Sequence, residues 1–250
     1  SFGQLSFAPL SQALISAFGW VAALWSLAAA ALATIPMALS FRERKGEAKP
    51  AHAPGLSLGT QVRGAFRDPS YLCLHAGFFT CGFHIAFLVT HLPGEVALCG
   101  LPAAASAAAL AIIGLGNIAG SVSAGWLGQS YRMKWILFAM YGARAAAILA
   151  YLALPKTTAT LYAFSAVLGF TWLATVPMTA GIVGKLFGVR YLATLFGFTL
   201  LTHQVGAFFG AWLGGIALAR SGNYDWMWYA DAALAFAAAF VNLPIREAPV

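Results

Sequence analysis

Residues 101–127 read LPAAASAAALAIIGLGNIAGSVSAGWL and contain no charged side chain. About 20 apolar residues are enough for a helix to cross the hydrocarbon core of a bilayer. A helix on the surface of a soluble protein keeps a polar face toward water, and this segment has no such face. The segment therefore predicts a transmembrane helix.

The composition extends this interpretation to the whole chain. Hydrophobic residues make up 61% of the 250 residues, and charged residues make up only 8%. A soluble domain has about a quarter charged residues, which cover its surface. We therefore expect an all-α transmembrane fold whose surroundings are the lipid bilayer.

Charges, prolines and turn residues divide the chain into eight candidate spans, of which the first is shortened. The spans cover residues 2–18, 20–40, 70–92, 101–127, 134–154, 159–184, 191–219 and 226–243. Six spans after a long polar loop are typical of the second half of a transporter built from two six-helix halves. The expected parts are the last two helices of a first half (1–40), a basic loop with a short interfacial helix (41–69), a complete second half (70–243) and a tail (244–250). The alternative is a complete eight-span protein of another family.

The basic residues collect on alternate connections. The loop 41–69 holds six Lys and Arg residues, the connections at 128–134 and 185–190 hold two each, and the tail holds one. The opposite side has only Lys156 and Arg220. Because cytoplasmic loops are enriched in Lys and Arg, we expect the long loop and the C-terminus to be cytoplasmic. The same distribution argues against a nucleic-acid partner, although the net charge is +7.

One motif lies between the fourth and fifth expected spans, where the sequence reads GWLGQSYRMK from residue 125 to 134. It is similar to the G-x-L-x-D-R-x-G-R-R loop of a known family. The positions of interest are Gly125, Leu127, Arg132 and Lys134. Gln129 and Ser130 stand where Asp and Arg are usual, which weakens any expectation of a charge-pair latch at this loop.

A second motif lies in the first two expected spans, where Gly3-Gln4 and Pro9-Leu10 precede Gly19-Trp20. With these motifs the chain resembles the major facilitator superfamily, in the bacterial branch related to the monocarboxylate and oxalate:formate transporters. The resemblance covers essentially the whole chain. It implies a helix bundle of the major facilitator type in a bacterial inner (plasma) membrane, with this chain as the C-terminal part and the missing N-terminal half as its partner. No cofactor is expected.

Strongly polar side chains at membrane depth are costly, so they mark the places where a substrate site is expected. The resemblance implies that the third and sixth spans line a central cavity, that the fourth and seventh flank it, and that the fifth and eighth are peripheral. The candidate substrate-binding residues are His84, Asn117, Trp172, Thr175, His203, Gln204 and Arg144. The alternative for each is a structural hydrogen bond to a neighbouring helix. Asp231 is expected near the outer end of its span, as an interfacial or pairing residue.

Glycines recur every fourth residue in two expected spans. The positions are Gly116 and Gly120 in the fourth span and Gly206, Gly210 and Gly214 in the seventh. Such a flat face lets another helix backbone approach closely. Static packing and a sliding contact both remain open as explanations.

These features favour a secondary transporter of a small organic solute. The resemblance suggests a carboxylate as that solute, moved by alternating access. A structural or assembly fragment is the alternative, and an intramembrane enzyme is a weaker one. No catalytic residue is expected, and the sequence contains no H-E-x-x-H or G-x-x-x-x-G-K-[ST] motif, so no metal ligand or nucleotide site is expected either.

Overall fold

The computed structural model describes residues 2–36 and 56–247, and its regular elements are all α-helices. The helices are α1 (Phe2–Leu32), α3 (Leu58–Ala65), α4 (Pro69–Leu98), α5 (Ala103–Leu127), α6 (Met133–Ala153), α7 (Thr158–Trp172), α8 (Thr175–Phe187), α9 (Leu192–Ser221) and α10 (Asp225–Val241). The expected all-α transmembrane bundle is confirmed. The expected part 41–55 of the long loop lies outside the described residues.

Six helices in the described part of the chain are long and apolar enough to cross a membrane. They run over Pro9–Leu32, Pro69–Leu98, Ala103–Leu127, Met133–Ala153, Thr158–Phe187 and Leu192–Ser221. The expected third span was too short at 70–92, because the helix continues through Pro93 to Leu98. The expected last span is shorter than predicted, because α10 has 17 residues.

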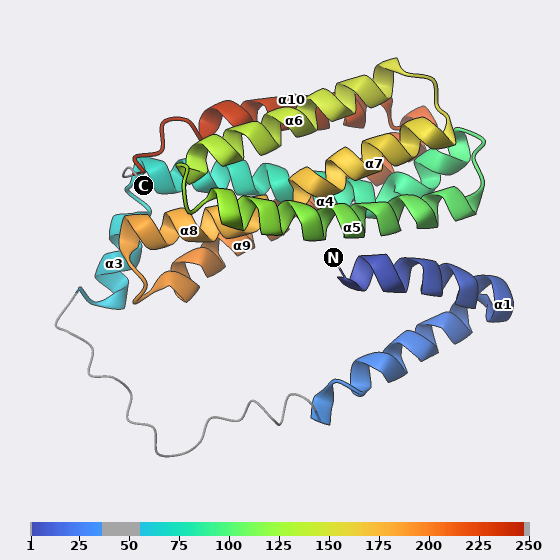
Figure 1. The fold of residues 1–250 in the computed structure, drawn as a ribbon, viewed down its shortest axis with the longest axis horizontal. Helices are drawn as coiled ribbons and strands as arrows, with labels where there is room; N and C mark the ends of the chain where they lie inside the picture. The colour runs from blue at the N-terminus through green and yellow to red at the C-terminus, as the bar shows by residue number, and fades with distance from the viewer. Residues whose placement is uncertain (1, 37–55, 248–250) are drawn as a thin grey trace.

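The first two expected spans are the two arms of α1. Gly19 separates them with φ 80° and ψ 166°, a backbone conformation that glycine adopts at little cost because it has no Cβ. The two arms fold back from each other at this point (Figure 1). The arm before Gly19 contacts α5, so the N-terminal segment lies against the six-helix half.

Three close helix pairs build that half: α4 with α9, α5 with α7, and α6 with α10. Glycines make the first two pairs close. A Cβ at Gly206 or Gly210 of α9 would collide with the carbonyl oxygen of Phe79 or Phe83 on α4. Gly116 and Gly120 of α5 meet the backbone at Phe170 in the same way, and Gly214 meets the ring of His91.

This contact gives a testable consequence for Gly210. Gly210→Ala is expected to destabilise the protein by roughly 1–3 kcal/mol, because the added methyl group must push α4 and α9 apart. Gly215→Ala is the matched control on the same helix, since a Cβ there meets nothing within 4 Å, and alanine favours the helix. Thermal unfolding of the purified full-length protein measures both. Equal melting temperatures for the two variants would contradict the close contact.

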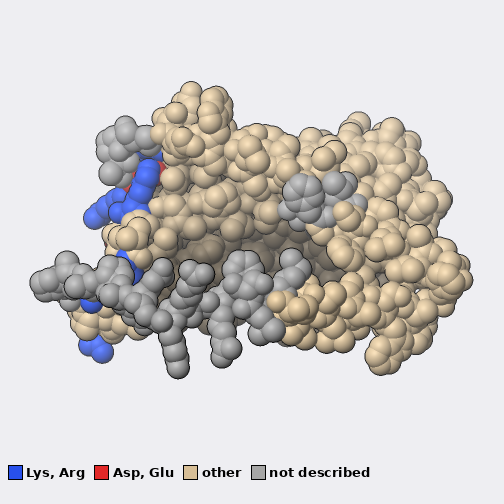
Figure 2. Space-filling view, turned by 60° about the horizontal axis from the view of Figure 1, so that its bottom comes forward, with Lys and Arg blue, Asp and Glu red and all other residues tan. Residues whose placement is uncertain are grey.

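Lys and Arg side chains gather at one end of the molecule, the end that carries α3 and the C-terminus (Figures 1 and 2). The basic residues described there are Arg63, Arg67, Arg132, Lys134, Lys185, Arg190 and Arg246. The α6–α7 turn with Lys156 and the end of α9 with Arg220 lie at the other end of the bundle. The basic loops, which were expected on one side of the membrane, therefore all lie at one end of the bundle.

The tail folds back onto this basic end. The Glu247 carboxylate accepts hydrogen bonds from the backbone N–H groups of Met133 and Lys134 at 2.9 Å each, and it forms an ion pair with Lys185 at 2.8 Å. Lys134 in turn donates its ammonium to the carbonyl oxygens of Leu243 and Ile245. Thus Lys134 of the loop motif pairs with the tail, while Gly125 is exposed and Arg132 is the N-cap of α6.

Candidate functional site

The sixth expected span is interrupted. A helix was expected over 159–184, but α7 ends at Trp172 and α8 begins at Thr175. Pro177 is the third residue of α8 and has no N–H for the carbonyl of Leu173, which instead accepts from Val176 at 3.2 Å. Broken helices are tolerated at membrane depth only where other groups satisfy the freed backbone.

Side chains from three helices supply those groups. The amide oxygen of Asn117, on α5, accepts the N–H of Leu173 at 3.0 Å. Arg144, on α6, donates its Nη2 to the carbonyl oxygens of Thr171 at 2.9 Å and Trp172 at 3.4 Å. The hydroxyl of Thr175 also donates to Trp172 at 3.0 Å. Four of the candidate residues, Asn117, Arg144, Trp172 and Thr175, therefore meet at this break.

Arg144 is the unusual member of this group. Its side chain is 0% exposed, and its Nε and Nη1 have no hydrogen-bond partner among the described residues. Its guanidinium carbon lies 5.1 Å from the ring centre of Tyr141. Because an arginine stays charged in proteins, this places a permanent positive charge with unused donors beside the break. Such a group can bind a carboxylate through a two-pronged hydrogen bond.

His84 was expected to face the cavity, and the structure instead places it between α4 and α10. Its side chain is 0% exposed, and its Nδ1 is hydrogen-bonded to the carboxylate of Asp231. Asp231 is also fully buried, so it is a pairing residue inside the bundle rather than an interfacial one. The signal for this role was the position of Asp231, an acidic residue inside the apolar segment 226–243.

His203 and Gln204 lie on α9, and His203 is a neighbour of Cys81 on α4, whose thiol is 3.4 Å from the hydroxyl of Thr175 at the break. The His203 ring nitrogen and the Gln204 amide oxygen are 3.0 Å apart, and Gln204 is exposed. The ring of His203 packs on Phe78 with 4.9 Å between ring centres. His203 is therefore half-buried at the contact between α9 and α4, and Gln204 is exposed beside it.

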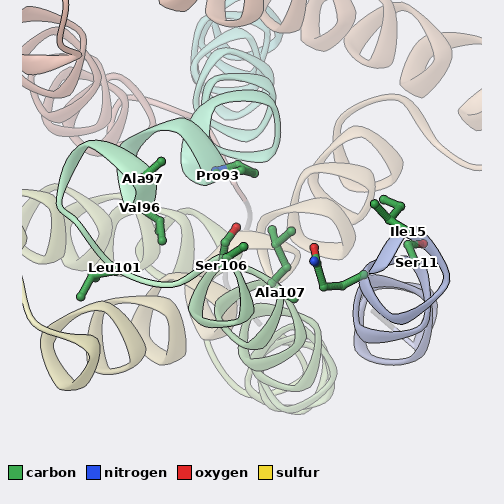
Figure 3. A pocket seen from close by; sticks show the side chains of 11 residues that line it. Ser11, Ile15, Pro93, Val96, Ala97, Leu101, Ser106 and Ala107 are labelled. Atoms are coloured by element: carbon green, nitrogen blue, oxygen red, sulfur yellow. The ribbon is translucent and has the colours of Figure 1, made fainter. Parts of the chain in front are cut away.

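A cavity of about 390 Å³ lies elsewhere, toward the end of the bundle opposite the basic end. It is formed between the first arm of α1, the end of α4 and the start of α5 (Figure 3). Ser11, Gln12 and Ser106 are its polar lining residues, and the rest of the lining is apolar. None of the expected site residues lies in it. Within residues 2–36 and 56–247, no group of three or more His, Cys, Asp or Glu side chains is placed to hold a metal ion.

Bilayer-length helices, a broken span and a buried arginine beside the break together define a polytopic membrane protein of the solute-transporter type. The chain belongs to the Major Facilitator Superfamily, whose family model matches residues 1–211. The expected family is thus confirmed, and it is a family of transporters rather than enzymes.

Two curated relatives are similar over most of the chain. Monocarboxylate transporter 13 of Rattus norvegicus is 24% identical over 235 residues, which are 88% of this chain. Monocarboxylate transporter 13 of Bos taurus is 26% identical over 226 residues, also 88% of this chain. The chain spans 51% of the length of each relative.

Proposed function

We propose that the chain is the C-terminal part of a secondary transporter that moves a small organic carboxylate by alternating access. The missing N-terminal half of the same polypeptide would form the other wall of the central site. The family membership and the names of the two relatives support this proposal. No cofactor and no chemical reaction are involved.

One observation carries the proposal: the charge of Arg144 lies beside the break between α7 and α8. Transporter sites are typically built at discontinuous helices near the bilayer midplane. There, the unused donors of Arg144 can hold the solute carboxylate, while Asn117, Trp172 and Thr175 fix the break around it. His203 and Gln204 are further candidates for contact from α9.

The test is counterflow in proteoliposomes that contain the full-length protein. Vesicles are loaded with an unlabelled carboxylate, and uptake of the labelled compound is followed with equal pH on both sides. A panel of small monocarboxylates and of matched neutral amides is used. We expect uptake of at least one carboxylate and not of its amide. No counterflow with any solute would favour a structural or assembly role, and equal uptake of the amide would remove the carboxylate from the proposal.

We also propose that the basic end of the bundle faces the cytoplasm, in accordance with the positive-inside rule. Cys99, the C-cap of α4, would then be reachable from outside. In a variant whose single cysteine is Cys99, a membrane-impermeant maleimide should label intact cells. A variant whose single cysteine is Ser130→Cys, at an exposed position of the basic end, should be labelled only after permeabilisation. The reverse pattern would contradict the orientation.

The rate at which the maleimide labels Cys99 should also depend on pH. Burial raises the pKa of the Cys99 thiol, and the nearby carboxylate of Glu95 raises it further. Since the thiolate is the reactive form, labelling at Cys99 should be slow at neutral pH and should accelerate as the pH increases.

A further inference from the structure

The cavity beside the N-terminal arm is not part of the proposed solute site. It lies between the first arm of α1, the end of α4 and the start of α5 (Figure 3). Its volume of about 390 Å³ falls within the range of small-molecule sites, about 300–1,000 Å³. None of the residues that meet at the α7–α8 break lines it. It is therefore a second place in which a small molecule can bind.

Polar side chains line this cavity and have hydrogen-bonding groups to spare. Ser106 of α5 is 6% exposed, and its hydroxyl makes no hydrogen bond to any residue in 2–36 or 56–247. Its side chain points toward the end of α4 (Figure 3). Gln12 of α1 donates its Nε2 to the hydroxyl of Ser16 at 3.4 Å, whereas its amide oxygen accepts nothing from the described residues. Because polar groups in protein interiors normally have partners, these groups favour a ligand with a polar head.

Pro93 of α4 adds an acceptor to the same wall. Proline has no N–H, so the carbonyl oxygen of Val89, four residues earlier, lacks its usual helical donor. Residues four apart lie on the same face of a helix, and Pro93 lines the cavity. A ligand head that both donates and accepts a hydrogen bond therefore suits this wall, as a hydroxyl or a primary amide does.

The rest of the lining decides the charge of the ligand. No Lys, Arg, His, Asp or Glu side chain lines the cavity. A carboxylate buried here would lose its water without gaining a cation, which is costly. A pure hydrocarbon would leave the hydroxyl of Ser106 and the amide of Gln12 unpaired. The lining therefore fits a neutral molecule with a short apolar body and one polar head.

The cavity adjoins the contact that joins the N-terminal segment to the six-helix half. A second cavity of about 550 Å³ lies along the same contact, and Gln12 and Ala107 line both. Alanines dominate the α5 side of the second cavity, at Ala104, Ala107, Ala108 and Ala111. Little side-chain surface therefore holds the arm against α5. A molecule in the first cavity touches the arm and the bundle at once and stabilises their contact.

We propose that this cavity binds a small neutral amphiphile, of the class of an aliphatic alcohol or primary amide. The head group bonds to Ser106 and Gln12, and the chain lies along Val96, Leu101 and Leu110. The bound molecule joins the N-terminal arm to the six-helix half. Its site is separate from that of the carboxylate and goes beyond the proposed function.

The test is photolabelling of the purified full-length protein with an octanol that carries a diazirine. Peptide mass spectrometry then locates the labelled residues. We expect saturable labelling within residues 11–15 and 93–110. Unlabelled octanol and octanamide should compete for the site. Octanoate at the same concentration should not compete, because the lining offers no cation.

Two variants and a control assign the labelling to this cavity. Ser106→Ala removes little besides the hydroxyl, so the octanol concentration for half-maximal labelling should rise about fivefold. Ala97→Phe places a ring in the cavity and should abolish saturable labelling. Ser123→Ala is the matched control on α5, because Ser123 does not line the cavity, and it should label like the wild type. The melting temperature of each variant reports whether it is folded.

Three results would overturn the inference. The first is labelling that does not saturate or that spreads evenly over the spans, which means partition into detergent only. The second is saturable labelling that remains unchanged in both Ser106→Ala and a folded Ala97→Phe variant. The third is competition by octanoate equal to that by octanol. No transport is measured in these experiments, so failure of this site is distinguishable from failure of the proposed function.

Discussion

Replacing Arg144 with Met is expected to reduce carboxylate counterflow about 100-fold, which corresponds to roughly 3 kcal/mol of lost charge-assisted binding. Met matches the length of the aliphatic part but supplies neither the charge nor the donors. Arg144→Lys retains the charge and loses the planar fork that holds Thr171 and Trp172. We expect it to recover only part of the activity, because a lysine cannot reproduce a two-pronged contact.

Arg144 also supports the break between α7 and α8, so folding must be measured alongside transport. Thermal unfolding of each purified variant separates the two effects. Arg220→Gln is the matched control, because Arg220 is a cation at the exposed end of α9. Its counterflow should remain close to that of the wild type. Wild-type counterflow in a folded Arg144→Lys or Arg144→Met variant would contradict the role given to Arg144.

Glu247→Gln is expected to be the most damaging conservative change at the basic end. The carboxylate accepts from two backbone N–H groups at once and pairs with Lys185. A glutamine amide has only one acceptor oxygen, so its NH₂ group would face a backbone donor. We expect a loss of about 2 kcal/mol and a fall in the melting temperature of about 4–8 °C.

The neighbouring residue provides a matched control for Glu247. Arg246 is exposed, and its described hydrogen bond to Ser70 uses the backbone N–H. Arg246→Gln should therefore leave the melting temperature unchanged. If Glu247→Gln and Arg246→Gln melt alike, the clamp formed by the tail contributes no measurable stability.

Much of the fold could be predicted because lipid imposes a length and an apolar surface on every span. Residues 101–127 and 134–154 were placed within one or two residues of α5 and α6 at most boundaries. The break at residues 173–174 was not predicted, although Pro177 was a signal for it. Periodicity does not distinguish one long helix from two helices that share an axis.

The site was predictable only in part. Asn117, Arg144 and Thr175 were identified because they are polar residues in apolar segments, but their meeting at one break depends on how α5, α6 and α8 pack. The pairing of His84 with Asp231 joins residues 147 positions apart, and the pairing of Glu247 with Met133 joins residues 114 apart. The angular positions of residues around one helix do not indicate which residue of another helix they will contact.

The most direct test of the account is a structure of the full-length protein with a transported carboxylate bound. We expect the solute carboxylate beside the α7–α8 break, with an oxygen at hydrogen-bond distance, about 3 Å, from Nε or Nη1 of Arg144. A solute bound only in the cavity lined by Gln12 and Ser106, with Arg144 contacting protein groups alone, would contradict it.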